Sequence, residues 1–267
     1  MNNTKCLAAL FDFDGVVVDT EPQYTIFWDE QGRKYLSEED FGRSIKGQTL
    51  GQIFGGYFTG MDDVQQQIVS DLNEYEKHMR FDFLPGVVNF MKALKEKGIK
   101  IAIVTSSNDL KMANVYREHP ELTSMVDRIL TSDSFTRSKP DPECFLMGAK
   151  VFDTVVDNCV VFEDSFHGLE AARRAGMKIV GLCTTNPREA ISDKANVVID
   201  DFTNFTVEDF EQLVEECHSR GINVVIDFVI NHSSSEHEWF VKASDYLRSL
   251  PAGAEPDLTK CPFVDYY

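Results

Sequence analysis

Short runs of apolar and β-branched residues recur along the chain, and stretches with a helical repeat of apolar positions separate most of them. The runs lie at Cys6–Phe11, Ile99–Val104, Cys159–Phe162, Lys178–Leu182 and Val197–Ile199. Strands that alternate with helices are typical of βαβ units, in which helices cover a sheet of parallel strands. The pattern therefore predicts an α/β fold built on a parallel sheet.

Several of the intervening helices carry start and stop signals. Pro85 and Gly86 open one helix that we expect to end at Gly98, because proline favours the first helical turn and glycine the end. Asp141 and Pro142 open a second in the same way. Ser165 is the predicted cap of a third helix, which ends at Gly176.

Residues 21–83 interrupt the alternation, because they contain amphipathic helical patterns and no strand pattern. The predicted helices are Tyr24–Gly32, Leu50–Phe58 and Asp62–Met79. This all-helical insertion begins after the first predicted strand and ends before the second. We therefore expect its junctions to lie together as a hinge above the carboxyl edge of the sheet, where a cap closes over a ligand.

Composition and charge narrow the function class. The 267 residues are 43% apolar, which is ample for a packed core, and 44 acidic against 26 basic residues give a net charge of −18. Such a field repels nucleic acid and anionic membranes, so we expect neither as a partner, and the pattern predicts no particular oligomer. The six cysteines form no CxxC pair, and we find no signal-peptide pattern and no run long enough to span a membrane. We therefore expect reduced thiols and a cytoplasmic protein.

Two carboxylates follow the first predicted strand. Asp12 and Asp14 lie two residues apart and project toward the crevice where α/β sheets bind ligands. Like charges so close resist joint ionisation, and Mg²⁺ would relieve the repulsion. A simple strand-ending turn, for which Asp and Gly15 are ordinary residues, is the alternative interpretation.

The other strand ends carry complementary groups. Thr105 follows the second strand and leads through Ser106, Ser107 and Asn108 into a helix, an arrangement that suits an anionic oxygen. Lys139 precedes the proline-fixed start of a helix, and Glu163 and Asp164 end a further strand. The four strand ends together offer a nucleophile, a hydroxyl group, a cation and metal-binding acids.

These four motifs, in this order and at strand ends, resemble the haloacid dehalogenase superfamily in its branch with a helical cap, over about residues 5–210. The resemblance implies a Rossmann-like core at 1–20 and 84–210 and a cap at 21–83. It implies that Asp12 forms an aspartyl-phosphate and that Asp14 acts as acid and base. It further implies that Thr105 and Lys139 hold phosphoryl oxygens, and that Mg²⁺ is bound by Asp12, the backbone carbonyl of Asp14, and Asp164, with Glu163 in support. Dehalogenases of the superfamily lack the second aspartate, so Asp14 favours phosphoryl transfer.

The segment Ser44–Leu50 resembles the cap specificity loop of the β-phosphoglucomutase group, with Lys46 and Gly47 in register. We expect a substrate-binding set made of Lys46, Gly47, Ser106, Ser107 and Asn108. A solvated surface lysine is the alternative interpretation of Lys46. His167, beside the motif of Glu163 and Asp164, is interpreted as structural rather than catalytic.

Three departures from the mutase pattern in the phosphate-binding positions, and a fourth at the cap hinge, favour a phosphatase. The cap arginine and the Lys-Asn pair that grip a second phosphate in mutases correspond here to Leu50, Asn108 and Asp109, and the cap-hinge histidine corresponds to Tyr24. We therefore expect a Mg²⁺-dependent phosphatase whose substrate is a small phosphate ester of a sugar or polyol. A β-phosphoglucomutase is the alternative.

The last part of the chain changes character. Residues 211–267 contain a helix with a glycine stop, a strand pattern at Ile222–Ile230, and Asp227, Asn231 and His232, which resemble the first conserved region of the α-amylase family. This is a partial α/β-barrel-like fragment without the two carboxylates of a retaining glycosidase, so we expect no glycosidase activity. A third hypothesis is a non-catalytic carbohydrate-associated protein in which this fragment matters.

Overall fold

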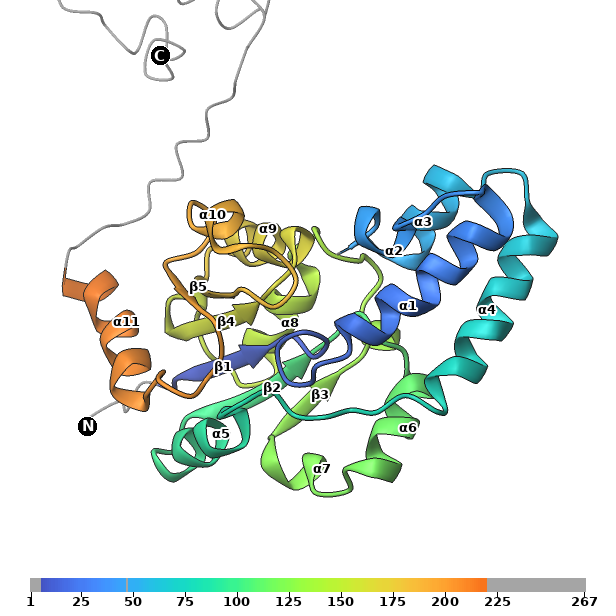
Figure 1. Cartoon of the computed structure of the whole chain (residues 1–267). Coiled ribbons are helices and arrows are strands. Elements are labelled where there is room, and N and C mark those ends of the chain that lie inside the picture. The colour runs from blue at the N-terminus through green and yellow to red at the C-terminus, as the bar shows by residue number, and fades with distance from the viewer. Residues whose placement is uncertain (1–5, 47, 220–267) are drawn as a thin grey trace, which may run out of the picture. The chain divides into compact units, whose positions relative to one another are not determined.

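A computed structural model describes residues 6–46 and 48–219, with the backbone alone for 216–219, and the chain divides into compact units at 1–219 and 220–267. The first unit contains a six-stranded parallel sheet in the order β3-β2-β1-β4-β5-β6 (Figure 1). Its strands are β1 (Ala8–Phe11), β2 (Lys100–Val104), β3 (Arg128–Leu130), β4 (Cys159–Glu163), β5 (Lys178–Leu182) and β6 (Val197–Ile199). The predicted α/β fold with a parallel sheet is therefore confirmed.

Helices cover both faces of the sheet, and the alternation of strand side chains assigns each helix to a face. Phe11 and Phe162 face one side, against α5 (Val87–Glu96), α6 (Asp109–Glu118), α7 (Leu122–Met125) and α11 (Val207–Ser219). Leu10 and Val161 face the other, against α8 (Glu143–Lys150), α9 (Phe166–Arg174) and α10 (Arg188–Ile191). The strands β1, β4 and β5 are buried along their whole length, as expected for parallel strands covered on both faces, while the edge strands β3 and β6 are partly exposed.

The insertion forms a helical body with its own core, drawn at the right of Figure 1. Its helices are α1 (Glu21–Gln31), α2 (Phe41–Ser44), α3 (Leu50–Tyr57) and α4 (Asp62–Glu76), and a π-helical turn, η1 (Gly32–Leu36), follows α1. Phe41 packs edge-on against Trp28, Tyr57 and Phe58 at ring-centroid distances of 5.0–6.3 Å. These aromatic contacts hold the helices together independently of the sheet.

The two chain segments that join this body to the sheet pair with each other. The amide of Asp19 donates to the carbonyl of Asp82 at 2.9 Å, and the amide of Leu84 donates to the carbonyl of Val17 at 2.9 Å. Val18 and Phe83 thus form an antiparallel bridge. The predicted junctions do lie together, at the edge of the sheet where β1 ends.

The C-terminal helix of the first unit belongs to the core. In α11, Phe210 is fully buried and stacks on Phe162 of β4 at 6.5 Å. The predicted boundary between 210 and 211 therefore falls inside this helix, and the division of the chain that we propose is after Ser219. The predicted strand at Ile222–Ile230 and the residues Asp227, Asn231 and His232 lie outside the described residues. Among the described helices, none is long and apolar enough to cross a membrane.

Candidate active site

The carboxyl ends of the strands and the facing side of the cap enclose a pocket of about 520 Å³. Neighbouring parallel strands end at the same edge of the sheet, so the groups that follow β1, β2 and β4 must converge. The predicted residues that line the pocket are Asp12, Asp14, Lys46, Thr105, Ser106, Ser107, Asn108, Lys139, Glu163 and Asp164. Gly47, the remaining predicted residue, lies outside the described residues.

Lys139 joins the ends of β1 and β4. Its ammonium group donates to Asp12 Oδ1 at 2.5 Å and to Glu163 Oε1 at 2.6 Å, and it also contacts the carbonyl of Val104 at 3.3 Å. A cis peptide bond precedes Pro140. The lysine side chain is 4% exposed, so its charge is balanced inside the protein by the two carboxylates rather than by water.

Glu163 is held in one position by the start of α9. Its Oε2 accepts from the backbone amides of Asp164 and Ser165, each at 2.9 Å. Ser165 in turn caps α9 by accepting from the amide of Gly168 at 3.1 Å. A Cβ atom at position 168 would lie 1.7 Å from Glu163 Oε1, so only glycine lets the helix approach this closely.

Asp164 is fixed by the loop after β5 and by the turn after β1. The hydroxyl group of Thr185 donates to Asp164 Oδ2, and the Thr184 hydroxyl group donates to the carbonyl of Gly15 at 2.5 Å. Gly15 has a φ of 75°, and a Cβ atom there would meet Asp164 Oδ2 at 2.0 Å. A side chain at position 15 is thus excluded by both its backbone conformation and the neighbouring carboxylate.

Asp12, Glu163 and Asp164 form a cluster of three buried carboxylates whose possible ligand atoms all lie within 4.8 Å of one another. Burial raises the pKa of Asp12 to about 7, despite the opposing charge of Lys139. Burial and the neighbouring Glu163 carboxylate also raise the pKa of Asp164 well above its ordinary value. Burial opposes the charge of Lys139, but Asp12 and Glu163 outweigh it and raise the pKa of the lysine above its ordinary value.

This donor set fits a hard divalent cation. The three carboxylates supply oxygen ligands, and the single lysine between them leaves part of their mutual repulsion uncompensated. The raised pKa values of Asp12 and Asp164 express the same cost, which a bound cation would remove.

Asp14 points into a different set of contacts. Its Oδ1 accepts from the hydroxyl group of Thr20 at 2.5 Å, and its Oδ2 accepts from Ser107 at 2.9 Å and from the Lys111 ammonium group at 2.5 Å. Burial acts to raise the pKa of Asp14, but the charge and hydrogen bond of Lys111 outweigh burial and lower it. The Asp14 carboxylate is not part of the three-carboxylate cluster.

Lys111 and Thr20 were missed by the sequence analysis. Lys111 occupies the first turn of α6, where Asn108 caps the helix by accepting from the Lys111 amide at 2.9 Å. A lysine three residues after a helix cap at a strand end lies at the same edge of the sheet as the strand tips. That position is the signal that could have identified it.

Thr105 and its neighbours have distinct surroundings. The hydroxyl group of Thr105 is buried and accepts from the amide of Ser107 at 3.0 Å, while Ser106 is exposed at the pocket wall. Leu50 and Asn108 line the pocket, whereas Asp109 accepts from the hydroxyl group of Thr131 at 2.7 Å and is not among the lining residues.

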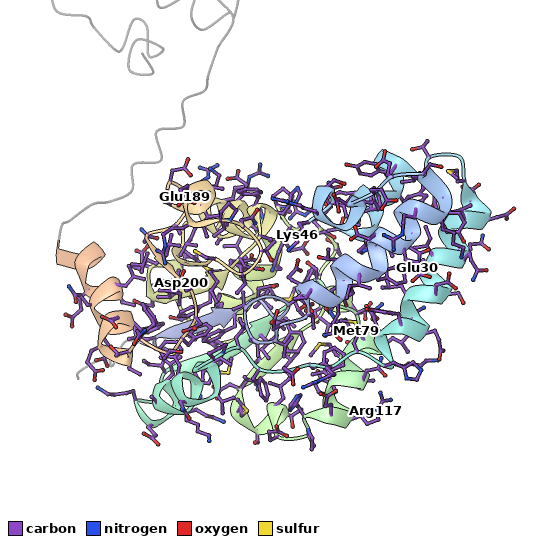
Figure 2. The ribbon with its side chains drawn as sticks, in the orientation of Figure 1. Glu30, Lys46, Met79, Arg117, Glu189 and Asp200 are labelled. Atoms are coloured by element: carbon purple, nitrogen blue, oxygen red, sulfur yellow. The ribbon has the colours of Figure 1, made fainter. Side chains whose placement is uncertain are left out.

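The cap supplies the opposite wall of the pocket. Lys46 lies where the cap faces the core (Figure 2), and its ammonium group is 3.6 Å from Glu21 Oε2. The hydroxyl group of Tyr24 donates to Glu76 Oε1 at 2.8 Å, which joins α1 to α4. His167 also lines the pocket and lies 3.5 Å from Gln52 of α3, so this side chain contacts the cap.

The comparison with known proteins bears on this geometry. Residues 9–182, about two thirds of the chain, match the haloacid dehalogenase-like hydrolase family. The chain belongs to this family. It is therefore an enzyme of the haloacid dehalogenase type, as the order of the four motifs predicts. Residues 196–267 match the catalytic domain of α-amylase, the region where the sequence resembles that family.

Individual relatives agree with the assignment. The phosphorylated carbohydrates phosphatase of Thermotoga maritima is 31% identical over 64% of this chain and 82% of its own length. The β-phosphoglucomutase of Bacillus subtilis is 27% identical over 75% of this chain and 92% of its own length. A match to the chloroplast protein SUPPRESSOR OF QUENCHING 1 of Arabidopsis thaliana, 29% identical, covers 77% of this chain but 20% of that protein.

The fold agrees as well. The crystal structure of β-phosphoglucomutase from Clostridium difficile superposes with a TM-score of 0.66, at 26% identity over 80% of this chain and 99% of that chain. The haloacid dehalogenase fold, with its Rossmann-like parallel sheet, is thus common to both proteins. Of the barrel-like fragment that we expected after residue 210, the part beyond Ser219 lies outside the described residues, and the part before it belongs to α11.

Proposed function

We propose that this haloacid dehalogenase-type enzyme is a Mg²⁺-dependent phosphatase of small phosphorylated sugars or polyols. One observation carries the proposal: Asp12, tied to Lys139, lies in a cluster of three carboxylates, while Asp14 two residues later lies outside the cluster on its own set of donors. A nucleophile beside a cation-binding group and a separate acid/base group is the arrangement that phosphoryl transfer needs.

The first half of the reaction forms a phosphoenzyme. A carboxylate oxygen of Asp12 attacks phosphorus, the bond from phosphorus to the ester oxygen breaks, and Asp14 gives a proton to the leaving alcohol. Lys139 and the hydroxyl group of Thr105 hold the phosphoryl oxygens. The residues that would hold Mg²⁺ are Asp12, Asp164 and the carbonyl of Asp14, with Glu163 in support, and the ion would supply positive charge to the dianionic phosphoryl group.

The second half releases phosphate. Asp14 takes a proton from water, the water oxygen attacks phosphorus, and the bond between Asp12 and phosphorus breaks, which restores the carboxylate. Lys111, Thr20 and Ser107 keep the Asp14 carboxylate in one place, and the charge of Lys111 favours the ionised form that this half needs. Buried carboxylates without such donors pay a large desolvation cost.

The structure around the pocket supports a phosphatase over a mutase. A mutase must bind a second phosphate, but Leu50 offers no donor there, Asn108 Oδ1 is used to cap α6, and Asp109 bonds to Thr131. The relationship to β-phosphoglucomutases of Bacillus subtilis and Clostridium difficile keeps that activity as the second candidate. We further propose a cytoplasmic location, supported by the free thiols of the described cysteines Cys6, Cys144, Cys159 and Cys183.

The test is a set of assays with purified protein and Mg²⁺. Phosphate release from sugar and polyol monophosphates is expected, and conversion of β-glucose 1-phosphate to glucose 6-phosphate without phosphate release would favour the mutase instead. Removal of Mg²⁺ with EDTA should abolish turnover, and added Mg²⁺ should restore it. Asp12→Asn should reduce kcat by at least about 10⁴-fold, because it removes the nucleophile; substantial residual turnover would overturn the role of Asp12.

The amylase-like segment adds no activity to this proposal. A maltooligosaccharide should be neither hydrolysed nor required for phosphate release. If the protein binds maltooligosaccharide and hydrolyses no phosphate ester, the carbohydrate-associated alternative is supported in place of the phosphatase.

A further inference from the structure

Acidic side chains outnumber basic side chains in the lining of the pocket. Three lysines and six carboxylates line it among the described residues, and two of the carboxylates, Glu21 and Glu76, come from the cap. The other four stand at the strand ends, where the phosphoryl group and its cation would bind. Glu21 and Glu76 therefore face the remaining space, which the leaving group of the substrate must occupy.

Each lysine of the pocket already has a carboxylate partner. Lys139 is shared by Asp12 and Glu163, Lys111 is paired with Asp14 at 2.5 Å, and Lys46 lies 3.6 Å from Glu21. Among the described residues, no arginine lines the pocket. A second anionic group on the substrate would thus have to displace an existing ion pair in order to gain a cation.

Glu76 adds a charge that lacks such a partner. It is 8% exposed, it is the last residue of α4, and it accepts a hydrogen bond from the neutral phenol of Tyr24 at 2.8 Å. Within the described part of the chain, no lysine, arginine or histidine nitrogen lies within salt-bridge distance of its carboxylate. Burial raises the pKa of Glu76, and the charge of Lys111, whose ammonium group lies 4.7 Å from the centre of the Tyr24 ring, only partly opposes this effect.

We infer that Glu76, together with Glu21, makes the cap side of the pocket select phosphate esters whose leaving group is uncharged and rich in hydroxyl groups, and reject esters that carry a second anionic group. This inference rests on the proposed phosphatase function and names its substrate class. A glutamate carboxylate accepts hydrogen bonds from sugar hydroxyl groups. A second phosphate or a carboxylate group on the substrate would instead be repelled by its negative charge in this poorly solvated space. Selectivity arises here by repulsion as well as by attraction.

The wild-type protein gives the first test. The value of kcat/KM is measured for three esters of similar size: glucose 6-phosphate, glucose 1,6-bisphosphate and 6-phosphogluconate. We expect glucose 6-phosphate to exceed each of the other two by at least about tenfold, since like charges in contact cost more than the free energy of one tenfold step. Equal or higher kcat/KM for either of the two esters with a second anionic group overturns the inference.

Substitution gives the second test. Glu76→Gln keeps an acceptor for Tyr24 and removes the charge, so the ratio of kcat/KM for the bisphosphate to that for glucose 6-phosphate should rise by about tenfold. Glu21→Gln, which releases Lys46, should move the ratio in the same direction. Glu74→Gln is the matched control, because Glu74 lies on the same helix, exposed and paired with Lys77, and should leave the ratio unchanged. An unchanged ratio in both pocket variants rejects the inference.

A binding measurement separates failure of the inference from failure of the proposed function. Calorimetric titration of Asp12→Asn protein with the same three esters and Mg²⁺ needs no turnover. If the wild-type protein hydrolyses none of the esters, the phosphatase proposal fails, while weaker binding of the bisphosphate by at least about tenfold still supports the charge selectivity. Equal or tighter binding of the bisphosphate contradicts it.

Discussion

Gly168 is a residue whose lack of a side chain lets α9 approach Glu163, one of the proposed metal-binding acids. The Glu163 carboxylate beside it is fully buried and held by Lys139 and by two backbone amides, so it cannot move aside for an added methyl group. We expect Gly168→Ala to lower the free energy of unfolding by about 1–3 kcal/mol through overpacking and to weaken Mg²⁺ activation. Urea unfolding and a Mg²⁺ titration of activity measure both effects.

The control for this prediction is Gly55→Ala. Gly55 lies within α3, and an added Cβ atom would meet nothing within 4 Å. Alanine should therefore leave stability unchanged or raise it by about 0.5–1 kcal/mol. A Gly168→Ala protein as stable as this control would contradict the close approach of α9 to Glu163.

Lys111 is the residue whose importance emerges only from the structure. Lys111→Met removes the ammonium group from Asp14 Oδ2 and leaves a buried carboxylate with two hydroxyl donors. We expect kcat to fall by about 10²-fold with a smaller change in KM, because in the proposed mechanism Asp14 transfers protons and does not hold the phosphate. Steady-state kinetics measures the two constants. A larger effect on KM than on kcat would indicate that Lys111 binds substrate instead.

At the residue scale, the groups at strand ends could be predicted because the parallel sheet brings them together in any fold of this topology. Asp12, Thr105, Glu163 and Asp164 follow from that rule, whereas Lys139 lies in the loop between β3 and α8, and its role was implied by the family resemblance. Lys111 and the pair of Tyr24 with Glu76 could not, since their contacts depend on the rotation of α6 and on the packing of α1 against α4. Neither quantity is encoded in a local pattern of residues.

Among the helices, α9 carries a charge network whose effect depends on pH. Hydrogen bonds from Arg173, followed by those from Arg174, lower the pKa of Glu170 from 4.5 to about 2. A carboxyl group whose pKa is lower in the folded protein stabilises the fold above its unfolded pKa, and this contribution disappears as pH falls through the folded value. The network therefore stabilises at neutral pH and loses its effect between about pH 4.5 and pH 2.

We expect Glu170→Gln to reduce the free energy of unfolding at pH 7 by no more than about 1 kcal/mol, because both arginines are exposed, Glu170 is 31% exposed, and solvent screens the charges. The difference from wild type should shrink as the pH is lowered below 4.5. Urea unfolding at several pH values measures it. Glu30→Gln is the control, because Glu30 is exposed on α1 (Figure 2) and forms no ion pair among the described residues. A difference that grows in acid would refute the assignment.

Element boundaries were predictable where capping residues mark them. The glycines at 98 and 176 follow α5 and α9 within two residues, and both have a positive φ, as expected for helix ends. The helices of the cap are less regular than the sequence pattern predicts. With Pro22 in its first turn, α1 begins at Glu21, three residues before the predicted start at Tyr24. The single-turn α2 and the π-helical η1 are too short to show a recognisable periodic pattern.

For the whole molecule, the packing of α11 decides where the chain can be shortened. Phe210, Leu213 and Val214 are buried against the sheet, so a chain that ends at Ser219 keeps the complete core of the first unit. We expect this truncated protein to retain the kcat/KM of the full chain within about twofold and a similar unfolding midpoint. Activity assays and thermal unfolding measure these quantities. Loss of activity would show that residues 220–267 contribute to the enzyme.

A shorter chain that ends at Thr206 provides the contrast. It lacks α11 and exposes the aromatic face of Phe162 and Phe205, which should lower the free energy of unfolding by several kcal/mol. Equal stability of the two truncated proteins would mean that α11 contributes little, contrary to its burial.

The bridge between Val18 and Phe83 has a consequence for how such an enzyme can diversify. The two ends of the insertion pair with each other at Val18 and Phe83, so the whole cap is attached to the sheet at a single place. Under the proposed function, changes within it would alter which alcohol is accepted, while Asp12, Lys139 and Glu163 belong to the core, which such an exchange leaves intact. In the proposed mechanism, the catalytic groups and the groups that select the substrate thus lie on separate parts of one chain.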